Sequence, residues 1–342
     1  MAIIDKPSDY FNTKLYTGNG STQSITGVGF APDWVWIKNR TSAEASGVFD
    51  TVRGVTKMLS SQNTDAESTD ANSLTAFGSD GFSVGSNLRV NQSSNNIVSW
   101  NWLAGGTASS NTDGSITSNV SASTTSGFSI VSYTGTGNAD ETVGHGLGVA
   151  PSMIIVKRRS GDAGDWRCYH KSLGEDYLIR LNLTNASLDN PSWNDTAPTS
   201  SVFSIGTNGD VNTSGGNHIA YCFAEKQGFS KFGSYIGNGS ASDGTFVYTG
   251  MRPAFVIVKR TDSADGWIMF DNKRSSFNIV DKNVQANSSN SETTYGYLDF
   301  TSNGFKLRMN GASANGSGAN YIYMCFAENP FVSSTGVPAT AR

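Results

Sequence analysis

One short sequence pattern occurs three times in this chain of 342 residues. A glycine-containing turn leads to a proline, a run of four largely apolar residues and cationic residues. The copies read GVGFAPDWVWIKNR from Gly27, HGLGVAPSMIIVKRR from His145 and GMRPAFVIVKR from Gly250. Internal repetition limits the fold more than any other feature, because each copy predicts one structural unit whose neighbours help to bury its core.

Other landmarks recur in step with this pattern. Each copy is preceded by a tyrosine-containing segment: Tyr16-Thr17-Gly18, Tyr133-Thr134-Gly135 and Tyr235-Ile236-Gly237. Each copy is followed by an aromatic closing segment: Trp100-Asn101-Trp102-Leu103, Tyr221-Cys222-Phe223-Ala224 and Met324-Cys325-Phe326-Ala327. The sequence therefore predicts three tandem units of roughly 100 residues each.

The apolar run after each proline predicts a strand that is buried on both faces. Strand side chains alternate, so Trp34 and Trp36 point to one face while Val35 and Ile37 point to the other. The runs Met153–Val156 and Val256–Val258 repeat this pattern and predict central strands. Frequent glycines and many Ser, Thr and Asn residues favour short strands joined by turns. We therefore predict an all-β protein of three tandem β-sandwich repeats that are jelly-roll-like.

The repeats set the predicted domain boundaries. We place the first sandwich at residues 1–104, the second at 127–226, and the third, with a C-terminal tail, at 227–342. Residues 105–126 are rich in Gly, Ser and Thr, nearly lack large apolar side chains, and are expected to form a linker. The second and third units have no spare chain between them. They are expected to pack as a rigid pair, with the first unit set apart.

Charge and targeting signals exclude several classes of protein. The charged fraction is 15% and the net charge is −4, so we expect no nucleic-acid partner. No apolar segment has the roughly 20 residues of a spanning helix, so we expect a soluble chain without membrane insertion. The N-terminus does not resemble a signal peptide, which predicts synthesis in the cytoplasm without export.

The three cysteines predict free thiols. Cys168, Cys222 and Cys325 are odd in number and lack the paired spacing of a metal site. Cys222 and Cys325 occupy equivalent closing strands in different units. We therefore expect no disulfide between them and mostly buried thiols.

Three long stretches resemble a known repeat family. HGLGVAPSMIIVKRR, AYCFAEKQGFSKFGSYIGNGSASDGTFVYTGMRPAFVIVKR and YIYMCFAENPFVSSTGVPATAR are similar to repeats in virion proteins of tailed bacteriophages, many of them marine. Members of this family are commonly tail-fibre or other structural proteins. The resemblance implies a location in the virion, with other virion proteins as partners. We also expect a homo-oligomer, for which a trimer is one arrangement.

The predicted function is recognition rather than catalysis. We favour a tail-fibre or receptor-binding protein that recognises the host surface; the alternatives are capsid decoration, as a head fibre or cement protein, and bridging of tail components. A polysaccharide-degrading enzyme is disfavoured, because no clustered pair of acids is recognisable. The G-x-S-x-G match at Ser83 lacks the following helix of a nucleophile elbow, and Ser83 aligns with Lys306 in the third copy. We therefore expect no catalytic residues and no cofactor.

A polar and aromatic cluster recurs in the second and third units. Its candidate ligand-binding residues are Trp166, His170, Trp267 and Asp271, with Tyr177 and Trp193 behind them. Aromatic rings beside carboxylates are suited to stacking on sugars, so a host-surface glycan is the expected ligand.

Two alternatives remain for this cluster. Asp162 and Asp165 could offer oxygen ligands to calcium, but they lack the alternating ligand run of a dedicated loop, so we predict no metal site. The tryptophans could instead begin strands that enter the core, and Asp271 could pair with Arg274 across a turn.

Overall fold

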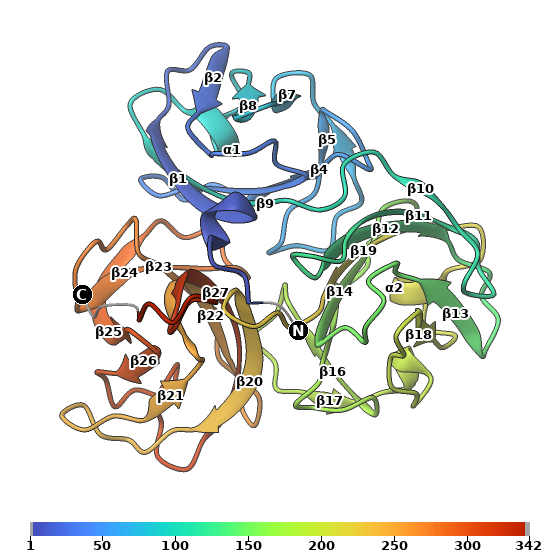
Figure 1. The fold of residues 1–342 in the computed structure, drawn as a ribbon. Helices are drawn as coiled ribbons and strands as arrows, with labels where there is room; N and C mark the ends of the chain where they lie inside the picture. Colours follow the sequence, from blue (N-terminus) through green and yellow to red (C-terminus); the bar gives the residue numbers. More distant parts are fainter. Residues whose placement is uncertain (1–2, 339–342) are drawn as a thin grey trace.

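The computed structural model describes residues 3–338, and strands form most of its regular structure. Three lobes surround a common centre (Figure 1). The first unit contains β1 to β9, the second β10 to β19 and the third β20 to β27. The helices within residues 3–338 are single turns: η1 (Pro7–Asp9), α1 (Leu88–Asn91), η2 (Pro191–Trp193) and α2 (Gly209–Asn212). The all-β prediction is confirmed. No helix in this range could span a bilayer.

The inner sheets of the three units share one antiparallel strand order. The first unit has the order β1 (Phe11–Thr17), β9 (Asn96–Trp102), β3 (Trp34–Asn39) and β4 (Gly47–Asp50). The second has β12 (Phe128–Thr134), β19 (Asn217–Phe223), β14 (Met153–Arg158) and β15 (Arg167–His170). The third has β20 (Ser230–Ile236), β27 (Asn320–Pro330), β22 (Met251–Arg260) and β23 (Trp267–Asp271).

A smaller outer sheet faces each inner sheet. Its strands are β2 (Gln23–Thr26), β8 (Gly81–Val84) and β7 (Leu74–Gly78) in the first unit, β13 (Glu141–Gly144) and β18 (Val202–Ile205) in the second, and β21 (Phe246–Tyr248), β26 (Gly304–Leu307) and β25 (Thr293–Thr301) in the third. In each unit the first of the equivalent strands (β1, β12 or β20) pairs with the last (β9, β19 or β27). The second (β2, β13 or β21) pairs with the one before the last (β8, β18 or β26). This is the pairing of a jelly roll.

The remaining strands of these units, apart from β10 and β11, are β5 (Lys57–Met58), β6 (Ser68–Thr69), β16 (Tyr177–Arg180), β17 (Leu188–Asp189) and β24 (Val280–Gln285). In the third unit β24 joins β23 to β25, so inner and outer strands form one continuous sheet of eight.

The repeated apolar strand is central and buried, as the sequence predicts. All six residues of β3 are buried, and β3 lies between β9 and β4. Val35 and Ile37 point into the first sandwich, whereas Trp34 and Trp36 point into a core at the centre of the molecule. β14 and β22 hold the same position in their sheets.

The central core is shared by all three units. The rings of Trp34 and Tyr221 stack with centroids 4.7 Å apart, and Trp102 meets Phe326 edge-on at 5.6 Å. Phe223 and Phe326 join the second unit to the third at 6.0 Å. The prediction that the first unit stands apart is therefore wrong, because the inner face of its sheet packs in one cluster with apolar side chains of the other two units.

The predicted linker at residues 105–126 contains two strands of the second unit. They are β10 (Ser109–Asn111) and β11 (Ser118–Ser123), and β11 pairs along its length with β12. Ile116 and Val120 are buried in the second sandwich. The linker prediction is wrong, because the edge of β12 supplies backbone partners to β11 and two buried apolar side chains, one before β11 and one within it, hold the segment against the core.

The cysteine prediction is confirmed. All three cysteines are free and buried. Cys168 lies in the central core, Cys222 in the second sandwich and Cys325 in the third. Burial raises the pKa of each thiol, so the thiolate form is disfavoured.

Truncation of the central rings tests the shared core. Phe223→Ala and Phe326→Ala should each lower the free energy of unfolding by about 3–5 kcal/mol, because each leaves a cavity among buried rings. Phe277→Ala is the matched control, since its side chain is 79% exposed and should cost less than about 0.5 kcal/mol. Denaturant unfolding measures all three. Unchanged stability of both core variants would contradict the shared core.

Candidate functional site

The four predicted ligand-binding residues lie inside the molecule. Trp166 and Trp267 are 1% and 2% exposed, and His170 and Asp271 are fully buried. Trp166 immediately precedes β15, which ends at His170, and β23 runs from Trp267 to Asp271, so each pair faces the same side of its strand. That side faces the central core or the contact between units. The prediction of a glycan site at these residues is wrong, because a side chain without exposed surface cannot stack on a sugar in solution.

The tryptophans connect neighbouring units. The Trp166 indole donates a hydrogen bond to the carbonyl oxygen of Ser60 in the first unit, at 2.9 Å. The Trp267 indole donates to the carbonyl oxygen of Arg180 in the second unit, at 2.8 Å. The alternative interpretation, in which each tryptophan enters the core at the start of a strand, is correct.

Asp271 belongs to a polar contact that recurs between units. Its carboxylate accepts a hydrogen bond from the indole of Trp100 in the first unit, at 3.1 Å. The equivalent Asp50 of the first unit accepts one from the Tyr221 hydroxyl of the second, at 2.7 Å. Each aspartate also forms a fully buried ion pair at 2.5 Å with the arginine three residues later. The predicted pairing of Asp271 with Arg274 is therefore confirmed.

A glutamate extends each ion pair to the next unit. Glu67 lies 3.1 Å from Arg53 of its own unit and 3.0 Å from Arg159 of the second unit. Glu292 makes the equivalent contacts with Arg274 at 3.3 Å and with Arg40 of the first unit at 2.7 Å. Two of the three contacts between units thus contain a chain of alternating charges.

The contact between the second and third units is neutral at the same positions. His170 replaces the aspartate, Leu173 the arginine and Ser187 the glutamate. The backbone N–H of Ser172 donates to Nδ1 of His170, so Nε2 carries the proton and donates to the carbonyl oxygen of Tyr323 at 3.2 Å. Burial lowers the pKa of His170 to about 4, which keeps the ring neutral.

The repeated lysine also crosses between units. Each ammonium group donates to a backbone carbonyl of a neighbouring unit: Lys38 to Ser289 at 2.7 Å, Lys157 to Thr64 at 2.8 Å and Lys259 to Thr184 at 3.1 Å. Burial lowers the pKa of each lysine to about 8. The repeated cation therefore joins the units and is not exposed to a ligand.

The other predicted residues are held by protein groups. Asp165 contacts Arg180 at 3.0 Å and accepts a hydrogen bond from Asn182 at 2.9 Å. Trp193 is buried against Tyr169, whereas Tyr177 is 41% exposed. Within residues 3–338, no group of three or more His, Cys, Asp and Glu side chains is arranged to hold a metal ion.

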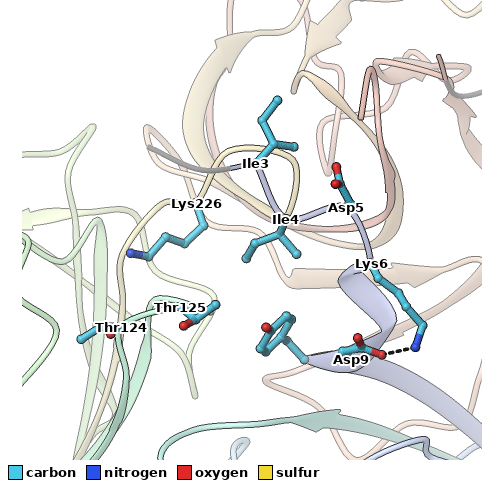
Figure 2. A pocket seen from close by; sticks show the side chains of 9 residues that line it. Ile3, Ile4, Asp5, Lys6, Asp9, Thr124, Thr125 and Lys226 are labelled. Atoms are coloured by element: carbon cyan, nitrogen blue, oxygen red, sulfur yellow. Dashed lines mark ion pairs between the residues drawn. The ribbon is translucent and has the colours of Figure 1, made fainter. Parts of the chain in front are cut away.

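Several hollows open near the N-terminal segment, and two of them share Lys226. The axial pocket, of about 370 Å³, is lined by Ile3, Ile4, Asp5, Lys6, Asp9, Tyr10, Thr124, Thr125 and Lys226. In Figure 2, Lys226 lies with the two threonines on one side, and Asp5, Lys6 and Asp9 lie on the other. The Lys6–Asp9 pair is internally balanced at 2.5 Å, and Asp5 accepts a hydrogen bond from the Ser334 backbone. The charged groups on this side of the axial pocket are therefore already paired with other protein groups.

The second hollow, here called the interunit groove, lies between the second and third units and has a volume of about 520 Å³. It is lined by Lys171, Glu225, Lys226, Gln227, Gly228, Ser230, Lys231, Tyr248, Thr249 and Gly250. Glu225 binds Lys171 at 2.6 Å and Lys231 at 2.5 Å. Burial opposes ionisation of Glu225, but these two lysines outweigh it and lower its pKa, so the carboxylate stays charged.

Sequence reasoning did not identify the residues of the interunit groove. A signal was present, because Tyr248 stands on β21 where the aligned strands have Thr26 and Gly144. An aromatic residue at a position that the other copies leave small departs from the repeat and is not required by the fold.

The fold and its surface define an all-β protein in which three sandwiches close around one aromatic core and the open hollows lie where units meet. A family model described as "Domain of unknown function (DUF7483)" matches residues 6–330. The chain belongs to this family. A comparison with curated proteins found no match.

Acid should weaken the contact at His170. Its folded pKa of about 4 lies below the ordinary value of 6.5, so the unfolded chain binds more protons between these values and stability falls as pH drops from 6.5 to 4. The loss should approach about 3 kcal/mol for this residue. His170→Gln should flatten this part of the dependence on pH, while His145 and His218 contribute equally to both proteins. Identical pH profiles would contradict the assignment.

The neutral contact should be transferable to the first unit. Arg53→Leu alone should cost about 3–5 kcal/mol, because it leaves Asp50 charged and buried without its cation. Adding Asp50→His reproduces the His170 and Leu173 arrangement and should recover most of that loss. Thermal and denaturant unfolding of the single and double variants measure this. A double variant no more stable than the single one would contradict the equivalence of the contacts.

Proposed function

We propose that the chain is a structural protein of a tailed-bacteriophage virion and acts as a tail-fibre or receptor-binding protein that recognises the host surface. The resemblance of its repeat stretches to phage virion proteins supports this location. The observation that carries the recognition role is the shared core. Because the inner faces of all three sheets are buried there, the molecule is a rigid scaffold that offers loops and interunit hollows to a partner.

A binding role fits the chemistry of the buried polar groups better than catalysis. His145, His170 and His218 are all fully buried, so none of them can reach a substrate in solution. Ser83 lies on β8 and its hydroxyl faces that of Ser24 at 3.1 Å. The short helix α1 begins at Leu88, so Ser83 is not at a strand-to-helix elbow.

One feature favours the alternative of a contact with another virion protein, as in capsid decoration or tail bridging. On the third unit, Phe277, Ile279 and Tyr295 are 79%, 49% and 53% exposed. The Asn278 side chain between the first two bonds both the N–H and the carbonyl oxygen of Phe300, at 2.9 and 2.8 Å. An apolar surface that is held in place in this way suits protein–protein docking.

Imaging of the intact phage particle tests the location. Electron cryomicroscopy should place the three-lobed density on the tail fibres, and the purified protein should adsorb to host cells and compete with the phage. Density spread over the capsid shell, together with no adsorption, would replace the receptor role with decoration. Absence of the protein from the particle would contradict both.

A further inference from the structure

The interunit groove has an excess of positive charge in a chain whose net charge is −4. Three lysines and one glutamate line it. Glu225 accepts one hydrogen bond from Lys171 and one from Lys231, at 2.6 and 2.5 Å. Each ammonium has three donors, so most of their donors remain available to a ligand. The two side chains are 40% and 36% exposed, and they are already ordered by the shared carboxylate.

The third lysine adds charge without a partner of its own. Among residues 3–338, no carboxylate lies within ion-pair distance of Lys226, although burial lowers its pKa. Lys226 also lines the axial pocket, so it stands between the two hollows. A ligand in the interunit groove would therefore meet two ordered ammonium groups, with a third close to one end.

An exposed ring borders the same groove. Tyr248 is 59% exposed at the edge strand β21. Gly250 has a φ of 72°, a backbone conformation that favours glycine, and the Tyr248 ring lies close to this turn, with its hydroxyl 3.5 Å from where a Cβ atom would stand. Flat aromatic surface beside hydrogen-bonding groups is what stacking on a sugar ring requires.

The contact between the third and first units acts as an internal comparison. Between the third and first units, a hollow of about 250 Å³ has Asn272 where the interunit groove has Lys171, and Asn12 where it has Lys231. Its glutamate, Glu328, is paired instead with Arg252 at 3.0 Å. The equivalent glutamate is thus balanced by one cation, so the second lysine of the interunit groove adds positive charge beyond what the pairing of Glu225 requires.

We infer that the interunit groove binds an acidic saccharide, with Lys171 and Lys231 contacting its carboxylate or phosphate and the Tyr248 ring stacking on a sugar. The volume of about 520 Å³ is within the range of small-molecule sites and could hold a short oligosaccharide. The inference rests on the proposed role in host-surface recognition, and it names the chemical class that this surface would present.

Titration calorimetry at low ionic strength tests the groove with defined probes. Trigalacturonate supplies carboxylates, glucose 6-phosphate supplies a phosphate on a sugar, maltotriose is the neutral control, and inorganic phosphate is the control for an ion alone. The protein should bind one or both acidic sugars at least about tenfold more tightly than maltotriose and inorganic phosphate. The preferred acidic sugar distinguishes the carboxylate from the phosphate source. Equal binding of the acidic sugars and inorganic phosphate, or no binding, would overturn the inference.

Variants assign the binding to the groove. Lys171→Gln with Lys231→Gln, which removes both cations but keeps amide donors beside Glu225, and separately Tyr248→Ala, should each weaken binding by about tenfold or more while the melting temperature stays near that of the wild type. Lys282→Ala is the matched control, because this partly exposed lysine contacts Thr294 and Asp281 outside the groove. Equal losses in the control, or none in the groove variants, would overturn the site.

Adsorption to host cells distinguishes the receptor role from ligand binding in the interunit groove. If the purified protein adsorbs to host cells and the groove variants adsorb equally well, the receptor role stands and the groove inference is wrong. If the groove variants lose acidic-sugar binding but the wild type does not adsorb to cells, the groove binds its ligand and the receptor role is wrong.

Discussion

Burial of the inner sheet faces in one common core is the constraint on which the structure depends. A sandwich normally covers one face of each sheet and leaves the other to solvent. Here β3, β14 and β22 are apolar on both faces, and their second faces meet around the pseudo-threefold centre. The Trp34 ring, for example, contacts the ring of Trp102 in its own unit and the ring of Tyr221 in the second unit. No unit could leave this arrangement without exposing a large apolar face to water.

The shared core also determines how polar groups are treated at the contacts. Charges taken out of water are costly unless each has close partners. Lys38, Lys157 and Lys259 meet this requirement with backbone carbonyls, and the Asp–Arg–Glu chains meet it with one another. At the positions of the Asp–Arg–Glu chain, the contact between the second and third units has neutral groups instead, with His170 as both donor and acceptor. The same backbone arrangement therefore holds ionic side chains at two of the contacts between units and neutral side chains at the third.

The sequence predicts the elements well because their signals are local. The alternation within Trp34–Ile37 is enough to identify a central strand buried on both faces. The relation between units depended on the partner of the second face, which no local pattern specifies. Residues 105–126 resemble a linker in composition because the segment buries only two large apolar side chains in the sandwich, Ile116 before β11 and Val120 within it. The rest of its stabilisation comes from pairing with β12, a partner that composition does not reveal.

The binding residues were assigned to the wrong class for a related reason. Trp166 and Trp267 recur at equivalent positions, and a sequence pattern alone does not separate recurrence for function from recurrence for packing. In a molecule whose copies meet around one core, recurrence instead marks what every contact requires. The lysines show this distinction within one residue type. The lysine at the position of Lys157 is present and buried in every unit, whereas Lys171 and Lys231 occur at one contact and are partly exposed. A residue that is exposed, charged and absent from the equivalent contacts has no role in closing the core. Such departures from the repeat are therefore where selection for a partner can be separated from selection for the fold.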